Sequence, residues 1–209
     1  MQVEHGFVWR AMLDTVEINL AGTRVLDAGC NRGGFLRLLF DETGIAEGFG
    51  YDPAPGAIED ARRLAGTRSL RFETAVTVPD GWTDFDGAFS HEVLYLLDDL
   101  PSHAAAIFAA LTPGAPYLAV MGVHAGSALM SEWHTLAAGE LRLPPLYHLD
   151  EVAGVFEAVG FEVAVARLRL NFIPVAAHRN EREDRGDLMA WLDYYAHDKV
   201  LLRCTRPEG

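Results

Sequence analysis

A glycine-rich segment, residues 24–35, has the residue types and spacing of a ligand-binding turn. It reads Arg-Val-Leu-Asp-Ala-Gly-Cys-Asn-Arg-Gly-Gly-Phe, an apolar stretch followed by small residues and then by a helical pattern. Small residues let the backbone approach a ligand closely, and the N-terminus of a following helix offers free N–H groups. The pattern predicts a site for a nucleotide-like ligand.

The acid at Asp27 indicates which kind of nucleotide fits. A dinucleotide-binding turn has the spacing Gly-x-Gly-x-x-Gly. Here Asp27 stands two residues before Gly29, and the next glycine is Gly33. A carboxylate at the strand end repels a pyrophosphate and attracts an ammonium group. The spacing therefore favours a cationic ligand over NAD.

Groups that can move a proton stand after two later apolar runs. His91 and Glu92 follow the run at residues 86–90, and His124 follows the run at residues 117–122. An imidazole or carboxylate within reach of an amine or hydroxyl can accept its proton, so the three are candidate catalytic bases. For Glu92 the alternative is an acid favoured by a helix dipole, and for His91 a side chain that packs on the ligand.

The elements that must position these residues alternate along the chain. Apolar runs of strand length alternate with longer helical patterns, which is typical of a parallel sheet built from βαβ units. In such a sheet, ligands bind at the edge where the strands end. Strands are expected at Arg24–Ala28 and at residues 47–51, 69–73, 86–90, 117–122, 161–170 and 199–205. Helices are expected within residues 1–22 and at residues 34–41, 55–64, 100–111 and Leu149–Val159.

Two connections are long for a compact fold. Residues 123–148 and 172–197 are predicted to cover a bound substrate, because long connections are often functional loops. For the charged stretch at residues 178–187, a solvated excursion is the alternative.

Three positions of the glycine-rich segment give the chain a resemblance to a known family. Asp27, Gly29 and Gly33 match the first motif of the class I S-adenosylmethionine-dependent methyltransferases, which reads hydrophobic-hydrophobic-acid-x-Gly-x-Gly-x-Gly. Asn31 replaces the middle glycine, and Asn is one of the few residues that tolerate a positive φ. The resemblance is good over residues 23–122 and implies S-adenosylmethionine as the cofactor.

The resemblance also implies roles around the cofactor. Asp52 ends the second expected strand, where the family has an acid that binds both ribose hydroxyls, and Pro53 then lines the adenine. Thr74, followed by Ala75, stands where the family often has an Asp for the adenine amino group. The implied cofactor site comprises Asp27, Gly29, Asn31, Gly33, Asp52, Pro53, Thr74, Ala75 and Ser90.

In the family, the segment after the fifth strand commonly forms part of the acceptor pocket. By resemblance, side chains of this segment and of the exit from the fourth strand contact the acceptor. These residues are Tyr95, Trp133, His134, Tyr147 and His148. The resemblance further implies a single-domain α/β fold with a Rossmann-like, doubly wound sheet of seven strands, mostly parallel, with an antiparallel C-terminal strand.

Composition limits the partners and the location. The 209 residues include 17 Lys and Arg against 30 Asp and Glu, a formal net charge of −13, and a chain of this sign repels nucleic acid. No apolar run approaches the ~20 residues of a membrane-spanning helix. The N-terminal residues lack the basic start of a signal peptide. We expect a soluble, cytoplasmic protein with no nucleic-acid or membrane partner.

Metal binding is not expected. Cys30 and Cys204 lie outside any paired Cys/His spacing, so they are interpreted as reduced, buried thiols. His124, His134 and His148 lie close together in sequence and suggest a metal site as the alternative. They lack the helical His-x-x-x-His spacing that such a site favours.

These features predict an S-adenosylmethionine-dependent methyltransferase that acts on oxygen or nitrogen of a small molecule, with secondary metabolism as the expected setting. One alternative is a protein that binds the cofactor as a sensor or scaffold. Another is an enzyme, such as a cyclase, that binds it without transferring the methyl group. No motif identifies the acceptor or distinguishes a monomer from a homodimer.

Overall fold

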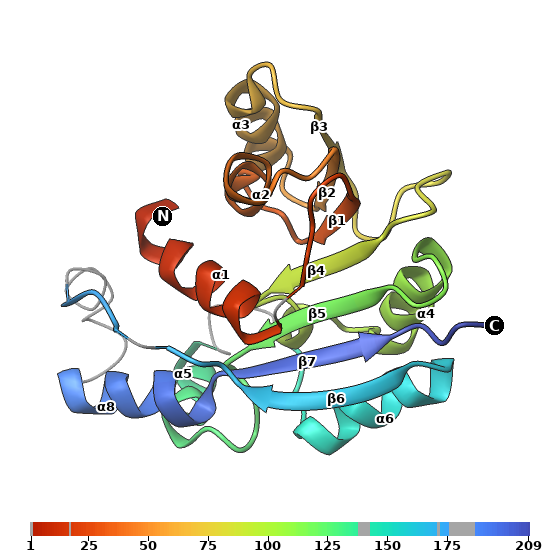
Figure 1. Ribbon diagram of the computed structural model, residues 1–209. Helices are drawn as coiled ribbons and strands as arrows, with labels where there is room; N and C mark the ends of the chain where they lie inside the picture. Colours follow the sequence, from red (N-terminus) through yellow and green to blue (C-terminus); the bar gives the residue numbers. More distant parts are fainter. Residues whose placement is uncertain (1, 17, 138–142, 171, 176–186) are drawn as a thin grey trace.

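The computed structural model describes residues 2–16, 18–137, 143–170, 172–175 and 187–209. The strands are β1 (Arg24–Ala28), β2 (Glu47–Asp52), β3 (Leu70–Thr74), β4 (Gly87–His91), β5 (Pro116–Met121), β6 (Glu162–Arg167) and β7 (Val200–Thr205). They form one sheet with the order β3-β2-β1-β4-β5-β7-β6 (Figure 1). β7 runs antiparallel to both of its neighbours, and the other pairs are parallel.

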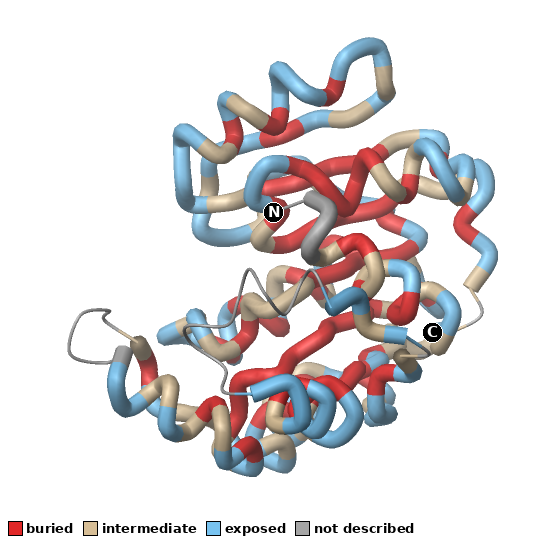
Figure 2. Tube along the Cα trace, turned by 90° about the vertical axis from the view of Figure 1, so that its left-hand side faces the viewer, coloured by how far each residue is buried: buried red, intermediate tan, exposed pale blue. Residues whose placement is uncertain are grey.

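Helices cover both faces of this sheet. They are α1 (Gln2–Val16), α2 (Gly34–Thr43), α3 (Pro55–Ala65), α4 (Leu100–Ala110), α5 (Ala128–Ala137), α6 (Leu149–Val159) and α8 (Leu188–Asp193), with the short turns η1 (Leu94–Leu96) and η2 (Tyr194–Asp198). One buried apolar cluster joins α1, α2, α3 and α8 to one face, and a second joins α4 and α6 to the other. Figure 2 shows the buried positions concentrated along the central strands, with exposed positions on the surrounding helices.

The sheet and its order of elements confirm the predicted fold class. β1 and α6 have the predicted bounds, and most other elements differ by one or two residues. β6 ends at Arg167, three residues before the expected end, although the N–H of Leu168 still bonds to the carbonyl of Lys199 beside it. α1 ends at Val16, before a turn in which Thr23 bonds back to Leu20.

The two long connections contain structure that the sequence patterns did not predict. The described part of residues 123–148 includes α5, and residues 188–198 form α8 and η2. Of the charged stretch at residues 178–187, residues 178–186 lie outside the described residues. Trp191, Tyr194 and Tyr195 of this second segment are buried. Its aromatic side chains therefore belong to the apolar cluster that also holds α1.

The register brings the ends of the central strands together at one edge. Asp27 of β1 pairs with Gly50 of β2 and with Phe89 of β4. The strand order reverses between β1 and β4, and at such a point an open α/β sheet has its ligand crevice. Among the described residues, no helix is both long and apolar enough to cross a membrane.

Candidate functional site

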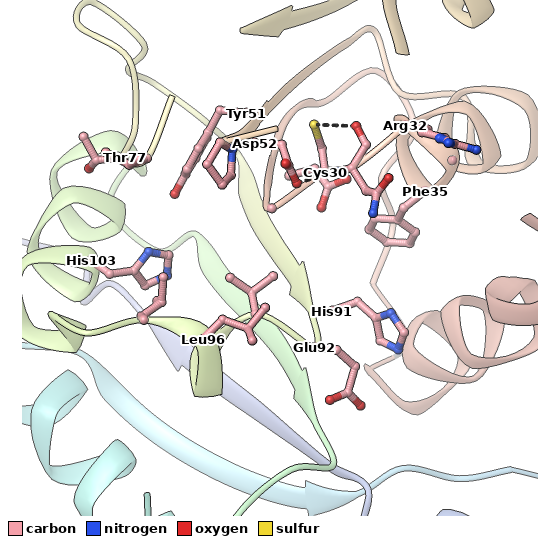
Figure 3. Close-up of a pocket in the computed structure, with 18 of the residues that line it drawn as sticks. Cys30, Arg32, Phe35, Tyr51, Asp52, Thr77, His91, Glu92, Leu96 and His103 are labelled. Atoms are coloured by element: carbon pink, nitrogen blue, oxygen red, sulfur yellow. Dashed lines mark hydrogen bonds between the residues drawn. The ribbon is translucent and has the colours of Figure 1, made fainter. Parts of the chain in front are cut away.

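A cavity of about 940 Å³ lies at this edge of the sheet. Its lining comes from α1, the turn after β1, the end of β2, the residues after β3, the exit from β4 and the start of α4. In Figure 3, Tyr51, Thr77 and His103 lie toward one end of the cavity and His91 and Phe35 toward the other. The cavity thus extends across several strand ends.

The turn after β1 brings backbone close to the cavity. Gly29 has a φ of 72°, and a Cβ placed on it would lie 2.4 Å from a Val93 methyl carbon. A larger residue would therefore clash with the β4 exit. Asn31 has a φ of 48°, so the residue that replaces the family's middle glycine adopts the left-handed conformation that its type tolerates. Gly33 precedes the first residue of α2 and is not among the lining residues.

Asp52 is held in place by two backbone bonds. Its Oδ2 accepts the N–H of Asn31 at 2.9 Å, and its Oδ1 accepts the N–H of Ala54, also at 2.9 Å. Each carboxylate oxygen can accept a second hydrogen bond. The side chain lines the cavity beside Pro53, so it can accept bonds from two hydroxyls of a ligand while the turn keeps it fixed.

Asp27 is a buried acid at the bottom of the same turn. It is 4% exposed and lines the cavity. Burial, and then the nearby charge of Asp52, raise the pKa of Asp27 well above its ordinary value. A cation bound in the cavity would favour the ionised form. The site is therefore electrostatically suited to a positively charged ligand.

Glu92, at the β4 exit, is fixed by elements far apart in sequence. It has a φ of 59°, which is uncommon for a residue other than glycine. Its carboxylate accepts the N–H of Gly122 at 3.2 Å and bonds the ammonium of Lys199, which is 2% exposed. Burial opposes ionisation, but the charges of Lys199 and His91 and these hydrogen bonds lower the pKa of Glu92 overall. Glu92 is thus kept as a carboxylate.

His91 contacts the N-terminal helix. Its ring centroid lies 5.3 Å from that of His5 and 6.4 Å from that of Trp9, both in edge-on arrangements. Trp9 packs against Phe35 of α2 at 5.7 Å. All four side chains line the cavity. α1 therefore forms an aromatic wall over the β4 exit.

A series of side-chain hydrogen bonds lies at the other end of the cavity and ends on His103 of α4. The Ser90 hydroxyl and the Tyr117 hydroxyl are 2.6 Å apart, and the Tyr117 hydroxyl is 3.1 Å from Nε2 of His103. His103 lines the cavity, whereas Ser90 does not. Burial lowers the pKa of His103 to about 4. The Ser90 contact with the cavity is therefore indirect.

The structure brings together only part of the predicted cofactor site. Asp27, Gly29, Asn31, Asp52 and Pro53 line the cavity. Gly33, Thr74, Ala75 and Ser90 do not. After β3, the lining residues are instead Val76 and Thr77.

The three predicted bases do not all lie at the cavity. His91 and Glu92 line the cavity, and His124 does not. His124 is 5% exposed; its Nδ1 accepts the N–H of Gly126 and its Nε2 bonds the carbonyl of Asp198. One ring nitrogen therefore joins the loop after β5 to η2, and the other forms a bond within that loop.

None of the predicted acceptor contacts lines the cavity. Tyr95 packs edge-on against Trp133 at 6.4 Å, and His134 bonds the carbonyl of Pro144. Tyr147 donates to the carbonyl of Leu97, which does line the cavity, and His148 begins α6. Tyr147 therefore contacts the cavity lining through Leu97.

Sequence patterns missed several residues of the site. Lys199 and His103 carry no local motif, because each reaches the site from a different element across the sheet. His5 and Trp9 stood within the expected N-terminal helix, where their aromatic character was the available signal. In the parts of the chain that the structure describes, no group of three or more His, Cys, Asp or Glu side chains is arranged to hold a metal ion.

Comparison with known proteins agrees with this geometry. Residues 6–165 match the family model described as a methyltransferase domain, which is more than half of the chain. A search of curated proteins found no match.

Solved structures share the fold at low sequence identity. A chain in the complex between the Haloferax volcanii Trm112 methyltransferase activator and a methyltransferase is 22% identical, with a TM-score of 0.83 over 100% of this chain and 92% of that one. Haemonchus contortus phosphoethanolamine N-methyltransferase 2, solved with S-adenosylmethionine, is 20% identical, with a TM-score of 0.69 over 96% of this chain and 52% of that one. A Mesorhizobium loti S-adenosylmethionine-dependent methyltransferase is 19% identical, with a TM-score of 0.69 over 97% and 98% of the two chains. By sequence match and fold, this chain belongs to the methyltransferase domain family and is a class I enzyme with S-adenosylmethionine as its cofactor.

Proposed function

We propose that this enzyme methylates a nitrogen or oxygen atom of a small molecule that enters the same cavity as the cofactor. The observation that carries the proposal is the continuity of the cavity. One space of about 940 Å³ is lined both by the turn after β1 and by His91 and Glu92 of the β4 exit. This volume is near the upper end of the ~300–1,000 Å³ of small-molecule sites, which leaves room for an acceptor beside the cofactor.

The residues present fit S-adenosylmethionine. Asp52 accepts the two ribose hydroxyls on oxygens that the turn already orients, and the buried Asp27 faces the positive charge of the amino acid part. The Tyr51 hydroxyl is buried and has no hydrogen-bond partner among the described residues, so a ligand can supply one. When bound, the cofactor supplies an electrophilic methyl group on a sulfonium.

The chain's own contribution is to orient the acceptor, exclude water and accept a proton. The aromatic wall of Trp9 and Phe35 shields the β4 exit, and such shielding favours an in-line displacement. His91 is the proposed base, because its imidazole lines the cavity at the β4 exit and an imidazole within reach of an amine or hydroxyl can accept its proton. Glu92 is a weaker base, since its pKa is lowered and its oxygens are engaged.

A two-step experiment tests the proposal. Calorimetric titration with S-adenosylmethionine and S-adenosylhomocysteine measures binding, and labelled methyl donor is then supplied with panels of amines, phenols and carboxylates. We expect binding of both compounds and label transfer to a member of the amine or phenol panels. Binding without any transfer would favour a cofactor-binding scaffold or an enzyme of another reaction type, such as the cyclase SpnF, whose fold is similar at a TM-score of 0.67.

A further inference from the structure

The Ser90–Tyr117–His103 chain ends in a nitrogen that is available to the cavity. Nε2 of His103 bonds the Tyr117 hydroxyl, and Nδ1 makes no hydrogen bond within the described residues. Nδ1 is not one of the fully buried polar atoms without a hydrogen-bond partner, so it retains some exposure. Figure 3 shows the His103 ring projecting from α4 toward the cavity. A ligand there would meet Nδ1.

Only one placement of the protons lets every hydroxyl of the Ser90–Tyr117–His103 chain donate a hydrogen bond. Ser90 is 1% exposed, and its hydroxyl bonds only Tyr117 among the described residues, so its proton is used only if Ser90 donates to Tyr117. Tyr117 then donates to Nε2 of His103. The neutral imidazole must therefore carry its proton on Nδ1. His103 presents an N–H donor to the cavity.

The position of His103 indicates which part of the cofactor it meets; this step rests on the proposed function. With the ribose on Asp52 and the amino acid part toward α1 and His91, the adenine occupies the opposite end. That end contains Tyr51, Thr77 and His103 (Figure 3). In the cofactor, N9 of the adenine is bonded to the ribose, so the remaining ring nitrogens accept hydrogen bonds and the ring carries no N–H. An N–H donor at this end is complementary to it.

We propose that His103 donates its Nδ1–H to a ring nitrogen of the cofactor's adenine, and that Ser90 and Tyr117 fix the imidazole in the tautomer that can donate. Thr74, the residue that the family resemblance placed at the adenine, is exposed and outside the cavity lining. His103 recognises the base from α4 instead. Ser90 and Tyr117 act as positioning residues.

Deaza analogues of S-adenosylhomocysteine test the donation. Each analogue replaces one ring nitrogen, at position 1, 3 or 7, with C–H and so removes one acceptor. We expect the native enzyme to bind one of the three about tenfold more weakly than the parent compound, because a buried N–H then lacks a partner. Equal binding of all four compounds would overturn the proposal, while tight binding of the parent would leave the proposed function intact.

A His103→Phe variant identifies the donor. We expect it to bind the parent compound more weakly and to lose the discrimination against the sensitive analogue. His197→Phe is the matched control, since His197 is exposed and bonds Arg167 outside the cavity; it should keep the native discrimination. If the His103 variant still discriminated against the sensitive analogue, another group would be the donor and the proposal would be overturned.

The tautomer can be read directly in the native enzyme, which keeps the test independent of how the variant folds. Nitrogen-15 NMR of the labelled imidazole distinguishes a protonated from an unprotonated ring nitrogen. We expect His103 to carry its proton on Nδ1, with and without S-adenosylhomocysteine, and Ser90→Ala to weaken this preference in the free enzyme. A proton on Nε2 in the bound native enzyme would contradict the proposed donation.

Discussion

At the scale of single residues, Asp52 offers the sharpest test of the cofactor site. Its two oxygens accept backbone N–H groups from Asn31 and Ala54, so its orientation is fixed before the ligand arrives. We expect Asp52→Ala to weaken S-adenosylhomocysteine binding by more than about tenfold, since hydrogen bonds to a charged group contribute ~2 kcal/mol. Calorimetry measures the change. The exposed Asp150→Asn serves as control, and an unaltered dissociation constant for Asp52→Ala would remove Asp52 from the site.

Asp27 links cofactor binding to pH. The pKa of Asp27 is raised well above its usual value by burial and then by Asp52, so the free enzyme holds a proton there at a pH where an exposed acid has lost it. A bound cation favours the ionised form and expels this proton. We therefore expect affinity for S-adenosylmethionine to rise with pH until Asp27 ionises in the free enzyme.

Calorimetry in buffers of different ionisation enthalpy measures the protons released on binding. In Asp27→Asn the release attributed to this group should disappear, and the affinity should be lower and less dependent on pH. Equal proton release by the variant and the native enzyme would show that another group is coupled to binding.

His91 and Glu92 differ in the way they are held, and their variants should differ too. We expect His91→Ala to leave cofactor affinity nearly unchanged and to slow transfer by about a hundredfold, the lower end of general-base contributions. Glu92→Gln, which keeps the shape, should slow transfer less. Single-turnover rates with the acceptor from the panel experiment measure both. Equal rates for the native enzyme and His91→Ala would mean that the acceptor arrives deprotonated or that another group accepts the proton.

At the scale of elements, the ion pair between Glu92 and Lys199 joins β4 to the start of β7. Lys199 is 2% exposed, and its ammonium also lies 3.4 Å from the Tyr194 hydroxyl of η2. Removing one member of such a pair leaves the other charge buried, which typically costs about 3–5 kcal/mol. We expect Lys199→Met to lower the free energy of unfolding by ~3 kcal/mol and to raise the pKa of Glu92, because its nearest positive charge is gone.

Chemical denaturation of Lys199→Met, Glu92→Gln and the double variant tests this coupling. The double variant should recover part of the stability lost in Lys199→Met, since no unpaired charge remains. Strictly additive losses would show that the two side chains do not stabilise each other.

The elements around the cofactor turn could be predicted because their signals are local. β1 and α2 follow from a buried apolar run, a turn of small residues and a helical pattern, all within residues 24–43. α8 and η2 could not, because the aromatic residues that define them are stabilised by packing against Phe7 of α1, far away in sequence. Local patterns do not encode that contact.

The same distinction applies within the site. Asp27, Asp52, His91 and Glu92 stand at strand ends, and strand ends of a parallel sheet meet at one edge. Ser90 stands beside them in sequence but faces Tyr117, because successive side chains of a strand alternate between the two faces. His103 gains its contact with the cavity from the way α4 packs, which no motif records.

At the scale of the whole molecule, buried titratable groups connect the site to stability. The pKa of His103 falls to about 4 because of burial, whereas an exposed histidine in the unfolded chain titrates near 6.5. The folded-state value is the lower one. His103 therefore contributes stability that is fully present above about pH 6.5 and is lost as the pH falls toward 4. The full loss is of the order of 3 kcal/mol, at ~1.4 kcal/mol per pH unit.

Other buried groups also make stability depend on pH, with different signs. Asp27, with its raised pKa, takes up a proton in the folded state first and so favours folding as the pH falls, whereas Glu92, with its lowered pKa, loses stability on acidification. The effect of His103 is isolated by subtracting the unfolding free energy of His103→Phe from that of the native enzyme at each pH. We expect this difference to fall by ~3 kcal/mol between pH 6.5 and 4, in favour of the variant. If the unfolding free energies of the two proteins changed in parallel with pH, His103 would be protonated equally in the folded and unfolded chains. Burial would then not be what keeps its imidazole neutral.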